Sequence, residues 1–234
     1  MTTSPNTPQQ NVQQSFEAFY QKWLSSQENL LERLLTVSAM PDSAAEVERR
    51  SRLIEEVMCH YRQYLEEKSK VASVDVFLLF SPTWLSAYEG ALLWIGDYKP
   101  SLILRLVDGA VEGLTAEQRE RVERMREETK RAEREVSEAM ASVQESMASP
   151  RVVGLVRVLD GEITELESAI EGLKRALVRV WKRADELRAS TVRKVVGILS
   201  PPQTVQFLAA TMLFQMRVRK WGLQRDEVDG GPSS

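Results

Sequence analysis

One histidine and one cysteine are the side chains best suited to covalent or acid–base chemistry in this 234-residue chain. They are neighbours, Cys59 and His60. Nucleophilic catalysis needs a thiol and a base that face each other within hydrogen-bond reach. Neighbouring side chains on a helix point about 100° apart, so these two do not form such a pair. We expect Cys59 to pack as a small hydrophobic side chain and His60 to lie at a helix surface.

The sequence gives little support for a metal-binding site or a phosphate-binding site. Structural zinc sites take four Cys or His ligands, and the chain has one Cys and one His. The Glu-x-x-His motif of di-iron bundles and the Gly-rich phosphate loops are absent from the sequence. Carboxylates are dense after Thr115, but they alternate with Arg and Lys. Glu120 with Arg124 and Glu127 with Arg131 have the spacing of ion pairs along a helix. The sequence therefore predicts no enzyme, no metal site and no cofactor.

Two basic amphipathic stretches are the most distinctive charged features. The first is 173–196, whose candidate contact face consists of Lys174, Arg175, Arg179, Lys182 and Arg183. The second is the end of the last predicted helix, where Arg217, Arg219 and Lys220 lie beside Met212, Met216 and Trp221. Such helices bind calmodulin, acidic proteins or phosphate. The alternative, commoner in bundles, is that the apolar side is core and the cations are solvated.

The overall composition narrows the class of protein. Hydrophobic residues make up 43% and charged residues 28%, so the chain can bury a core. A net charge of −3 argues against a surface built throughout for nucleic acid. The single cysteine excludes an intrachain disulfide. Because no apolar run approaches the roughly 20 residues that span a bilayer, we expect no membrane segment and a location in the nucleus, the cytoplasm or both.

Hydrophobic periodicity predicts an all-α protein, with about seven helices in one domain and no convincing strand. The domain is expected at 15–222, between disordered tails at 1–14 and 223–234. Helices are predicted at 12–37, 43–70, 81–96, 101–111, 115–148, 153–187 and 201–221, with a short helix leading to Ser200 and a possible break near Asp160. The segment 71–80 is expected to be a buried connector or a helical turn. A thin heptad-like seam after the Thr115–Gln118 capping box permits a homodimer.

Three segments carry a recognisable pattern. The first contains Trp84, Glu89, Trp94, Gly96, Pro100 and Ser101. The second contains Asp185, Leu187, Arg188 and Gln203. The third is 16–35, with Trp23 in its middle. In this order they resemble the Delay-of-Germination family of plant proteins over roughly 15–222. One departure is Asp97, where that family often has a second glycine.

The resemblance implies a regulatory domain that also forms the C-terminal part of the TGA class of basic-leucine-zipper transcription factors. With about 14 residues ahead of the domain there is no room for a basic region and zipper, so the stand-alone branch is implied. Its members act in seed dormancy, seed maturation, abscisic-acid responses and pollen-aperture placement by binding proteins, including clade A type 2C protein phosphatases. Calmodulin and zipper factors are alternative partners, and direct DNA binding is not expected.

Two further alternatives concern ligands. The resemblance implies haem binding through histidines of the last helix, but Gln215 and Arg219 occupy the aligned positions, so haem is not expected. A lipid held in the bundle is the other alternative. Finally, a buried carboxylate needs a partner, and we expect Glu89 to pair with Arg105 or Lys99 and so to fix the packing of the helix that begins at Pro100.

Overall fold

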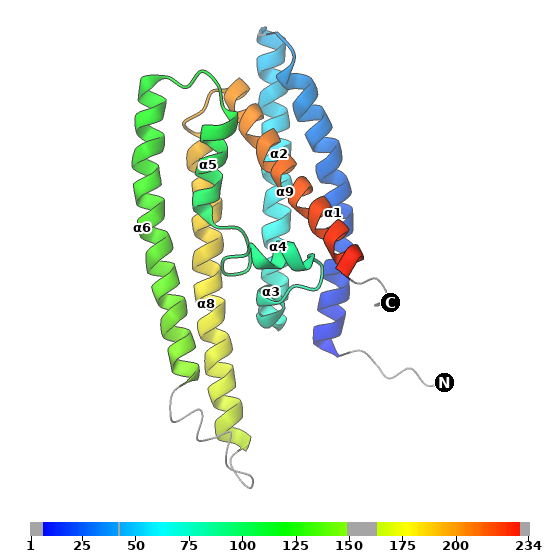
Figure 1. The fold of residues 1–234 in the computed structure, drawn as a ribbon, viewed down its shortest axis with the longest axis vertical. Helices are drawn as coiled ribbons and strands as arrows, with labels where there is room; N and C mark the ends of the chain where they lie inside the picture. The colour runs from blue at the N-terminus through cyan, green and yellow to red at the C-terminus, as the bar shows by residue number, and fades with distance from the viewer. Residues whose placement is uncertain (1–6, 42, 149–162, 230–234) are drawn as a thin grey trace, which may run out of the picture.

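The protein is a single all-α domain, which confirms the predicted fold class (Figure 1). The structure, a computed structural model, describes residues 7–41, 43–148 and 163–229. These residues form eight helices, labelled α1–α6, α8 and α9, and no β-strand. Within the described part of the chain no helix is both long and apolar enough to cross a membrane.

Helices α1 (Pro8–Ser38) and α2 (Ala44–Val74) form an antiparallel hairpin. A capping box between Thr7 and Gln10 begins α1, with proline at its first position. The helix therefore begins before the predicted start at residue 12 and lies partly within the predicted tail 1–14. Ser43 caps α2, and its hydroxyl accepts a hydrogen bond from the Glu46 backbone N–H at 3.2 Å.

A second hairpin consists of α6 (Ala116–Met147) and α8 (Ile163–Val196), which lie side by side (Figure 1). The capping box of Thr115 and Gln118 is confirmed. Helix α8 continues to Val196, so the predicted end at Leu187 and the separate short helix are wrong. The possible break near Asp160 lies outside the described residues.

Helix α9 (Pro201–Asp229) crosses over both α1 and α2 (Figure 1). It extends beyond the predicted end at Trp221, so residues 223–229, predicted to be tail, are helical. Asp226 accepts a hydrogen bond from the Ala87 backbone N–H at 3.1 Å, which ties this last part of α9 to the rest of the fold.

Three short elements connect the hairpins: α3 (Phe77–Phe80), α4 (Ala87–Ala91) and α5 (Pro100–Ala110). Helix α3 confirms the expected helical turn. The helix predicted at 81–96 is wrong, because only the short helix α4 forms there, with Ser86 as its N-terminal cap. The chain leaves the helical conformation after Leu92, since Ile95 and Gly96 have positive φ angles of 52° and 79°.

Buried apolar side chains form two clusters. One lies among the second half of α1, the first half of α2, α5, the start of α6 and α9, and includes Leu34, Leu104 and Phe207. The other lies among the first half of α1, the end of α2, α3, α6 and α8, and includes Phe16 and Trp181. Tyr61 packs against both clusters. The signature segments meet close to this junction.

Candidate functional site

The loop 92–99, called here the signature loop, is held by one arginine from a distant part of the chain. Arg188 of α8 donates hydrogen bonds to the backbone carbonyls of Trp94, Ile95 at 3.0 Å, Asp97 at 3.1 Å and Tyr98 at 2.8 Å. It also donates to the Asp185 carboxylate, one turn earlier on α8. A planar guanidinium with five donors suits this task, whereas a lysine ammonium does not.

A buried lysine joins the loop to two helices. Lys68 of α2 is 1% exposed, and its Nζ donates to Asp97 at 2.9 Å and to Asp185 at 3.3 Å. Burial alone would raise the pKa of Asp97, but the charges of Lys68 and Arg188 outweigh burial and hold this pKa below its ordinary value. We call Lys68, Asp97, Asp185 and Arg188 the ion cluster. It connects α2, α8 and the loop by charge-assisted hydrogen bonds.

A second buried ion pair fixes α4 against α9. Glu89 is 3% exposed and accepts a hydrogen bond from Arg219 at 3.2 Å. The same carboxylate oxygen accepts from the backbone N–H and the hydroxyl of Ser86, which completes the capping box of α4. Arg219 also donates to the Trp84 carbonyl at 3.1 Å. The expected pairing of Glu89 with Arg105 or Lys99 is therefore wrong, because α9 rather than α5 lies against this carboxylate.

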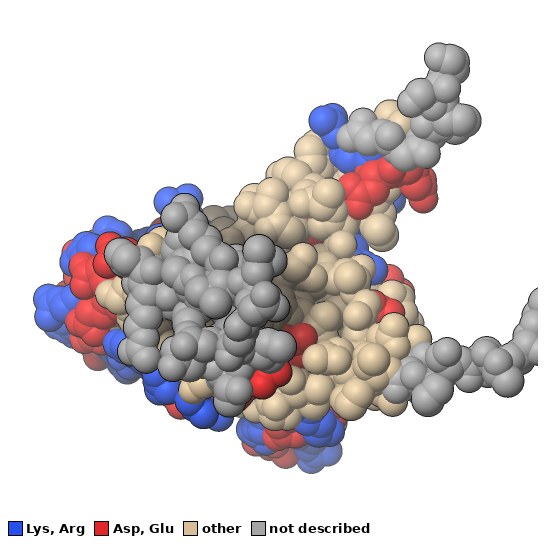
Figure 2. Space-filling view, turned by 90° about the horizontal axis from the view of Figure 1, so that it is seen from below, with Lys and Arg blue, Asp and Glu red and all other residues tan. Residues whose placement is uncertain are grey.

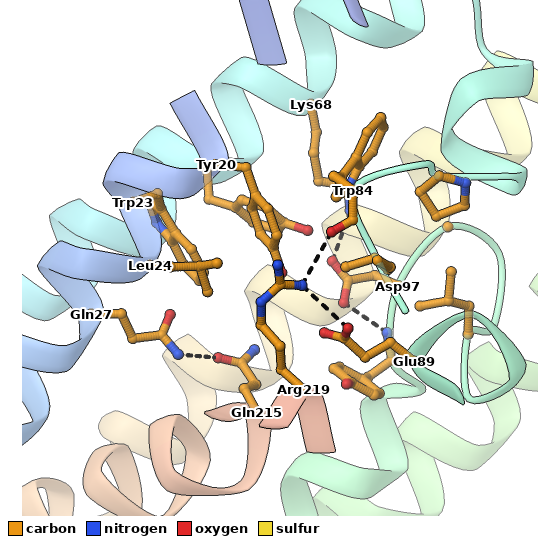
Figure 3. A pocket seen from close by; sticks show the side chains of 16 residues that line it. Tyr20, Trp23, Leu24, Gln27, Lys68, Trp84, Glu89, Asp97, Gln215 and Arg219 are labelled. Atoms are coloured by element: carbon orange, nitrogen blue, oxygen red, sulfur yellow. Dashed lines mark hydrogen bonds and ion pairs between the residues drawn. The ribbon is translucent and has the colours of Figure 1, made fainter. Parts of the chain in front are cut away.

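A small cavity lies between α1, the ion cluster and the pair formed by Glu89 and Arg219 (Figure 3). Its volume is about 40 Å³, and Tyr20, Gln27 and Gln215 are among its lining residues. Gln215 accepts hydrogen bonds from Gln27 and from the Tyr61 hydroxyl, each at 3.0 Å. In Figure 3, Arg219 points from α9 towards Glu89 and Trp84, and Gln215 points towards Gln27. The polar groups around the cavity are thus largely engaged with one another.

Gly96 allows the signature loop to pack closely on α8. Its φ of +79° is unfavourable for residues with a side chain, and a Cβ atom there would lie 3.0 Å from the Trp181 ring. Trp94 donates a backbone hydrogen bond to the Asp97 carbonyl at 2.7 Å across the turn and a side-chain hydrogen bond to Ser137 of α6 at 3.1 Å. The turn therefore presses against both helices of the second hairpin.

The Pro-Ser end of the signature begins α5. Pro100 is buried at the first position of the helix, and the Ser101 backbone N–H donates to the buried Glu133 of α6 at 2.5 Å. Lys99 lies 3.6 Å from the same carboxylate. An acidic side chain at a helix N-terminus interacts favourably with the helix dipole. This contact, rather than Glu89, connects the start of α5 to its neighbour.

Two signature residues lie away from the ion cluster. Gln203 accepts a hydrogen bond from the Ser200 N–H at 3.0 Å and donates to the Gly113 carbonyl at 3.1 Å, so it joins the start of α9 to the loop before α6. Leu187 is half-buried, and its carbonyl accepts a hydrogen bond from the Thr191 hydroxyl at 2.7 Å. Of these two residues, Gln203 connects separate segments, whereas the Leu187 contact lies within α8.

The candidate contact face on α8 consists of cations, most of which face outward. Arg175, Arg179, Lys182 and Arg183 are exposed, and Lys174 is half-buried. On the opposite side, Leu177 and Trp181 are in the core, at 4% and 2% exposure. Figure 2 shows Lys and Arg side chains next to Asp and Glu side chains at the edges of the face seen there. The apolar side of α8 is therefore already packed against other helices.

The arrangement of Cys59 and His60 is the reverse of the expected one. Cys59 is exposed, while His60 is buried and stacks on Trp23 with ring centroids 4.5 Å apart. Burial lowers the pKa of His60 to about 4. His60 faces the core because it follows Leu53 and Val57 at helical spacing on the buried side of α2. The two side chains do not form a catalytic pair.

The exposed charges of α6 pair largely as their spacing predicts. Arg124 and Glu120 approach to 2.6 Å, as expected. Glu127 pairs with Lys130 at 3.0 Å rather than with Arg131, because the three-residue spacing also brings the side chains together. Among the described residues no group of three or more His, Cys, Asp or Glu side chains is placed to hold a metal ion.

Sequence reasoning missed Lys68, Glu133 and Arg219 as members of buried ion pairs. A signal was present for Lys68, which stands between Tyr64 and Val71 at the helical spacing of the apolar side of α2. A charged residue in such a position indicates a buried partner. Glu133 stands in the same way between Thr129 and Val136 on α6, both of which are buried.

The positions that the resemblance aligns with haem ligands do not fit haem in this protein. Gln215 is engaged with Gln27 and Tyr61, and Arg219 with Glu89. The cavity that they line has a volume of about 40 Å³, far below that of a porphyrin. The only histidine of the chain, His60, is stacked on Trp23.

These observations define an all-α domain whose central loop is held by buried ion pairs. Comparison with known proteins shows the family to which it belongs. A family model described as "Seed dormancy control" (DOG1) matches residues 29–109. Protein ZW2 of Arabidopsis thaliana is 36% identical over 219 residues, covering 90% of this chain and 97% of the relative. Protein RESPONSE TO ABA AND SALT 1 of the same plant is 37% identical over 225 residues, covering 92% and 96%.

The chain therefore belongs to the seed dormancy control, or DOG1, family, and the resemblance inferred from its sequence is confirmed. Transcription factor TGA7 of Arabidopsis thaliana is 31% identical over 205 residues. That match covers 88% of this chain and 55% of the transcription factor. The relationship to TGA factors is thus also confirmed.

Proposed function

We propose that the protein is a non-enzymatic regulator that binds signalling proteins in abscisic-acid responses and in seed dormancy or maturation. The observation that carries the proposal is the likeness, over nearly the whole length of both chains, to a protein named for its response to abscisic acid and salt. The ion cluster is consistent with this role, because its side chains bind backbone carbonyls and one another and so build a rigid surface for a partner.

The partner contact is assigned to the cationic face of α8. Arg175, Arg179 and Arg183 are exposed there and attract an acidic protein surface. Type 2C protein phosphatases are the proposed partners. Calmodulin is a less suitable partner, because it encloses the apolar side of a target helix and that side of α8 lies in the core. A nucleus-and-cytoplasm location is proposed with this role.

The test is affinity capture from maturing seed extract with the full chain as bait, read by mass spectrometry. A triple variant, Arg175→Glu, Arg179→Glu and Arg183→Glu, reverses the α8 face. A matched control, Arg121→Glu, Arg124→Glu and Arg131→Glu, makes the same charge change on exposed positions of α6. We expect the unchanged chain and the control to capture type 2C phosphatases and the α8 variant to lose them. Capture by all three proteins would contradict the assignment of the face.

A second candidate function is association with zipper transcription factors, which the relationship to TGA7 favours. In the same experiment, this function predicts that zipper factors are recovered without phosphatases. Direct duplex binding would show a steep fall in affinity with salt. The net charge of −3 favours a protein partner over DNA.

A further inference from the structure

A second cavity lies on the other side of the signature loop, among α2, α5, α8 and α9. Its volume is about 180 Å³. Most of its lining is apolar, with Leu65, Leu102, Leu106, Val192, Phe207 and Phe214 contributed by all four helices. Apolar cavities of this size accept small apolar molecules.

Several polar groups in the lining of the cavity are already engaged in hydrogen bonds. The Tyr61 hydroxyl donates to Gln215 at 3.0 Å, and the Thr211 hydroxyl donates to the Phe207 carbonyl of its own helix at 3.0 Å. Arg188, at the inner wall, is bound to the loop carbonyls and Asp185. The lining of the cavity is therefore mainly apolar.

Two arginines at the rim have no such engagement. Arg62 of α2 and Arg193 of α8 line the cavity and are exposed. Within the described residues, neither guanidinium has an ion-pair or hydrogen-bond partner. This contrasts with the exposed Arg33 and Arg124, which pair with glutamates at 2.6 Å. Two unpaired cations beside an apolar cavity are complementary to a molecule with an apolar body and one acidic group.

We propose that this cavity binds a compact apolar carboxylic acid, with its body among the apolar side chains and its carboxylate at Arg62 and Arg193. The size of the cavity limits the size of the acid that it can bind. A cavity of about 150 Å³ accepts benzene, so this one takes an acid with about one ring. Long-chain lipids and haem are larger than this space. The inference goes beyond the proposed function, since it does not depend on which protein the surface of α8 binds.

The position of the cavity connects such a ligand to the signature loop. Asp97, Tyr98 and Gln215 line both this cavity and the small cavity of Figure 3. A ligand would therefore rest against the inner side of the loop that the ion cluster holds. Because a ligand that binds only the folded protein stabilises it, occupancy would make this loop harder to open.

The test uses 4-ethylbenzoate as the acid and 4-ethylbenzyl alcohol as an uncharged molecule of similar shape, each titrated into the full chain by isothermal calorimetry. For about eleven non-hydrogen atoms we expect a Kd for the acid of roughly 0.1–1 mM. The double variant Arg62→Gln and Arg193→Gln should weaken the acid about fivefold, as expected for two exposed charge contacts, and leave the alcohol unchanged. The control Arg121→Gln and Arg131→Gln, exposed on α6, which contributes no residue to the cavity, should change both Kd values less than twofold.

A cavity-filling variant supplies an independent readout. Val192→Phe places a ring in the space, so both molecules should lose binding while circular dichroism shows a folded protein. The proposal is overturned if the acid does not saturate below about 10 mM, which is tenfold above the weakest Kd expected here. It is also overturned if the acid and the alcohol respond equally to loss of the arginines, or if folded Val192→Phe binds as the unchanged chain does. If Val192→Phe does not fold, the arginine variants decide.

Discussion

The ion cluster and the outer surface of α6 contain the same types of charged residue in opposite settings. In the cluster, Lys68 and Arg188 are 1% and 7% exposed and make several hydrogen bonds each. On α6, Arg124 and Glu120 pair at 2.6 Å, but their side chains are 61% and 67% exposed. Solvent screens the second kind of pair, whereas removing one member of the first kind leaves an uncompensated buried charge. Location, not pairing, therefore decides how much a charge contributes to stability.

Removal of the Lys68 charge should have the largest effect. Lys68→Met keeps most of the apolar stem but leaves the carboxylates of Asp97 and Asp185 without their shared cation. The free energy of unfolding should fall by about 3–5 kcal/mol in urea denaturation. The matched control is Lys70→Met, two residues further along α2, whose side chain is 67% exposed. That control should change stability by less than about 0.5 kcal/mol. Equal losses of stability in the two variants would contradict the difference between buried and exposed charges.

The second-largest effect should be a loss of stability at low pH that is caused by His60. Its pKa is lowered by burial to about 4 in the folded protein, against about 6.5 in the unfolded chain. Between these values the unfolded chain binds a proton that the folded protein does not. Stability present above about pH 6.5 is therefore lost as the pH falls towards 4, by about 3 kcal/mol in total.

The control for this pH effect is His60→Phe, which keeps a ring stacked on Trp23. Urea unfolding at several pH values should show a shallower decline between pH 6.5 and 4 for this variant. Because His60 is the only histidine, a difference between the two curves reports on this residue. Two parallel curves would mean that His60 is protonated equally in both states.

Loss of Glu89 should have a somewhat smaller effect. Glu89→Ala removes the acceptor of three hydrogen bonds, from Arg219 and from two groups of Ser86. We expect a loss of about 2–3 kcal/mol in urea denaturation, because a buried donor and a helix cap lose their partner together. In a double-mutant cycle with Arg219→Ala the two losses should be non-additive. Full stability of Glu89→Ala would contradict any role of this carboxylate in holding α4.

The smallest effect is expected on the α6 surface. Arg124→Ala removes an exposed pair with Glu120 and should lower stability by less than about 0.5 kcal/mol. The measurement is thermal unfolding at low and at high salt, where the small difference from the unchanged chain should shrink further. A loss of more than about 2 kcal/mol would show that burial does not separate the two regions, because it would exceed what exposed pairs contribute.

Much of this fold was predictable from hydrophobic periodicity and caps. The Thr115–Gln118 capping box and the Pro100 start of α5 were read correctly, because both depend on residues close in sequence. The helix predicted at 81–96 failed because Ile95 has a positive φ, which is uncommon for a branched residue and is held by Arg188 from 93 residues away. The predicted partner of Glu89 was wrong for a similar reason, because the actual partner, Arg219, is 130 residues distant in sequence. Spacing alone does not reveal which distant helix supplies a partner.

The central claim is that Arg188 holds the signature loop in place, and hydrogen–deuterium exchange of Arg188→Lys tests it most directly. Lysine keeps the charge but cannot donate to four carbonyls in one plane. We expect peptides covering 92–99 to exchange much faster than in the unchanged chain, including the Trp94 amide that bonds to Asp97, while peptides from the middle of α1 keep their protection. Unchanged protection of 92–99 in Arg188→Lys would contradict the claim.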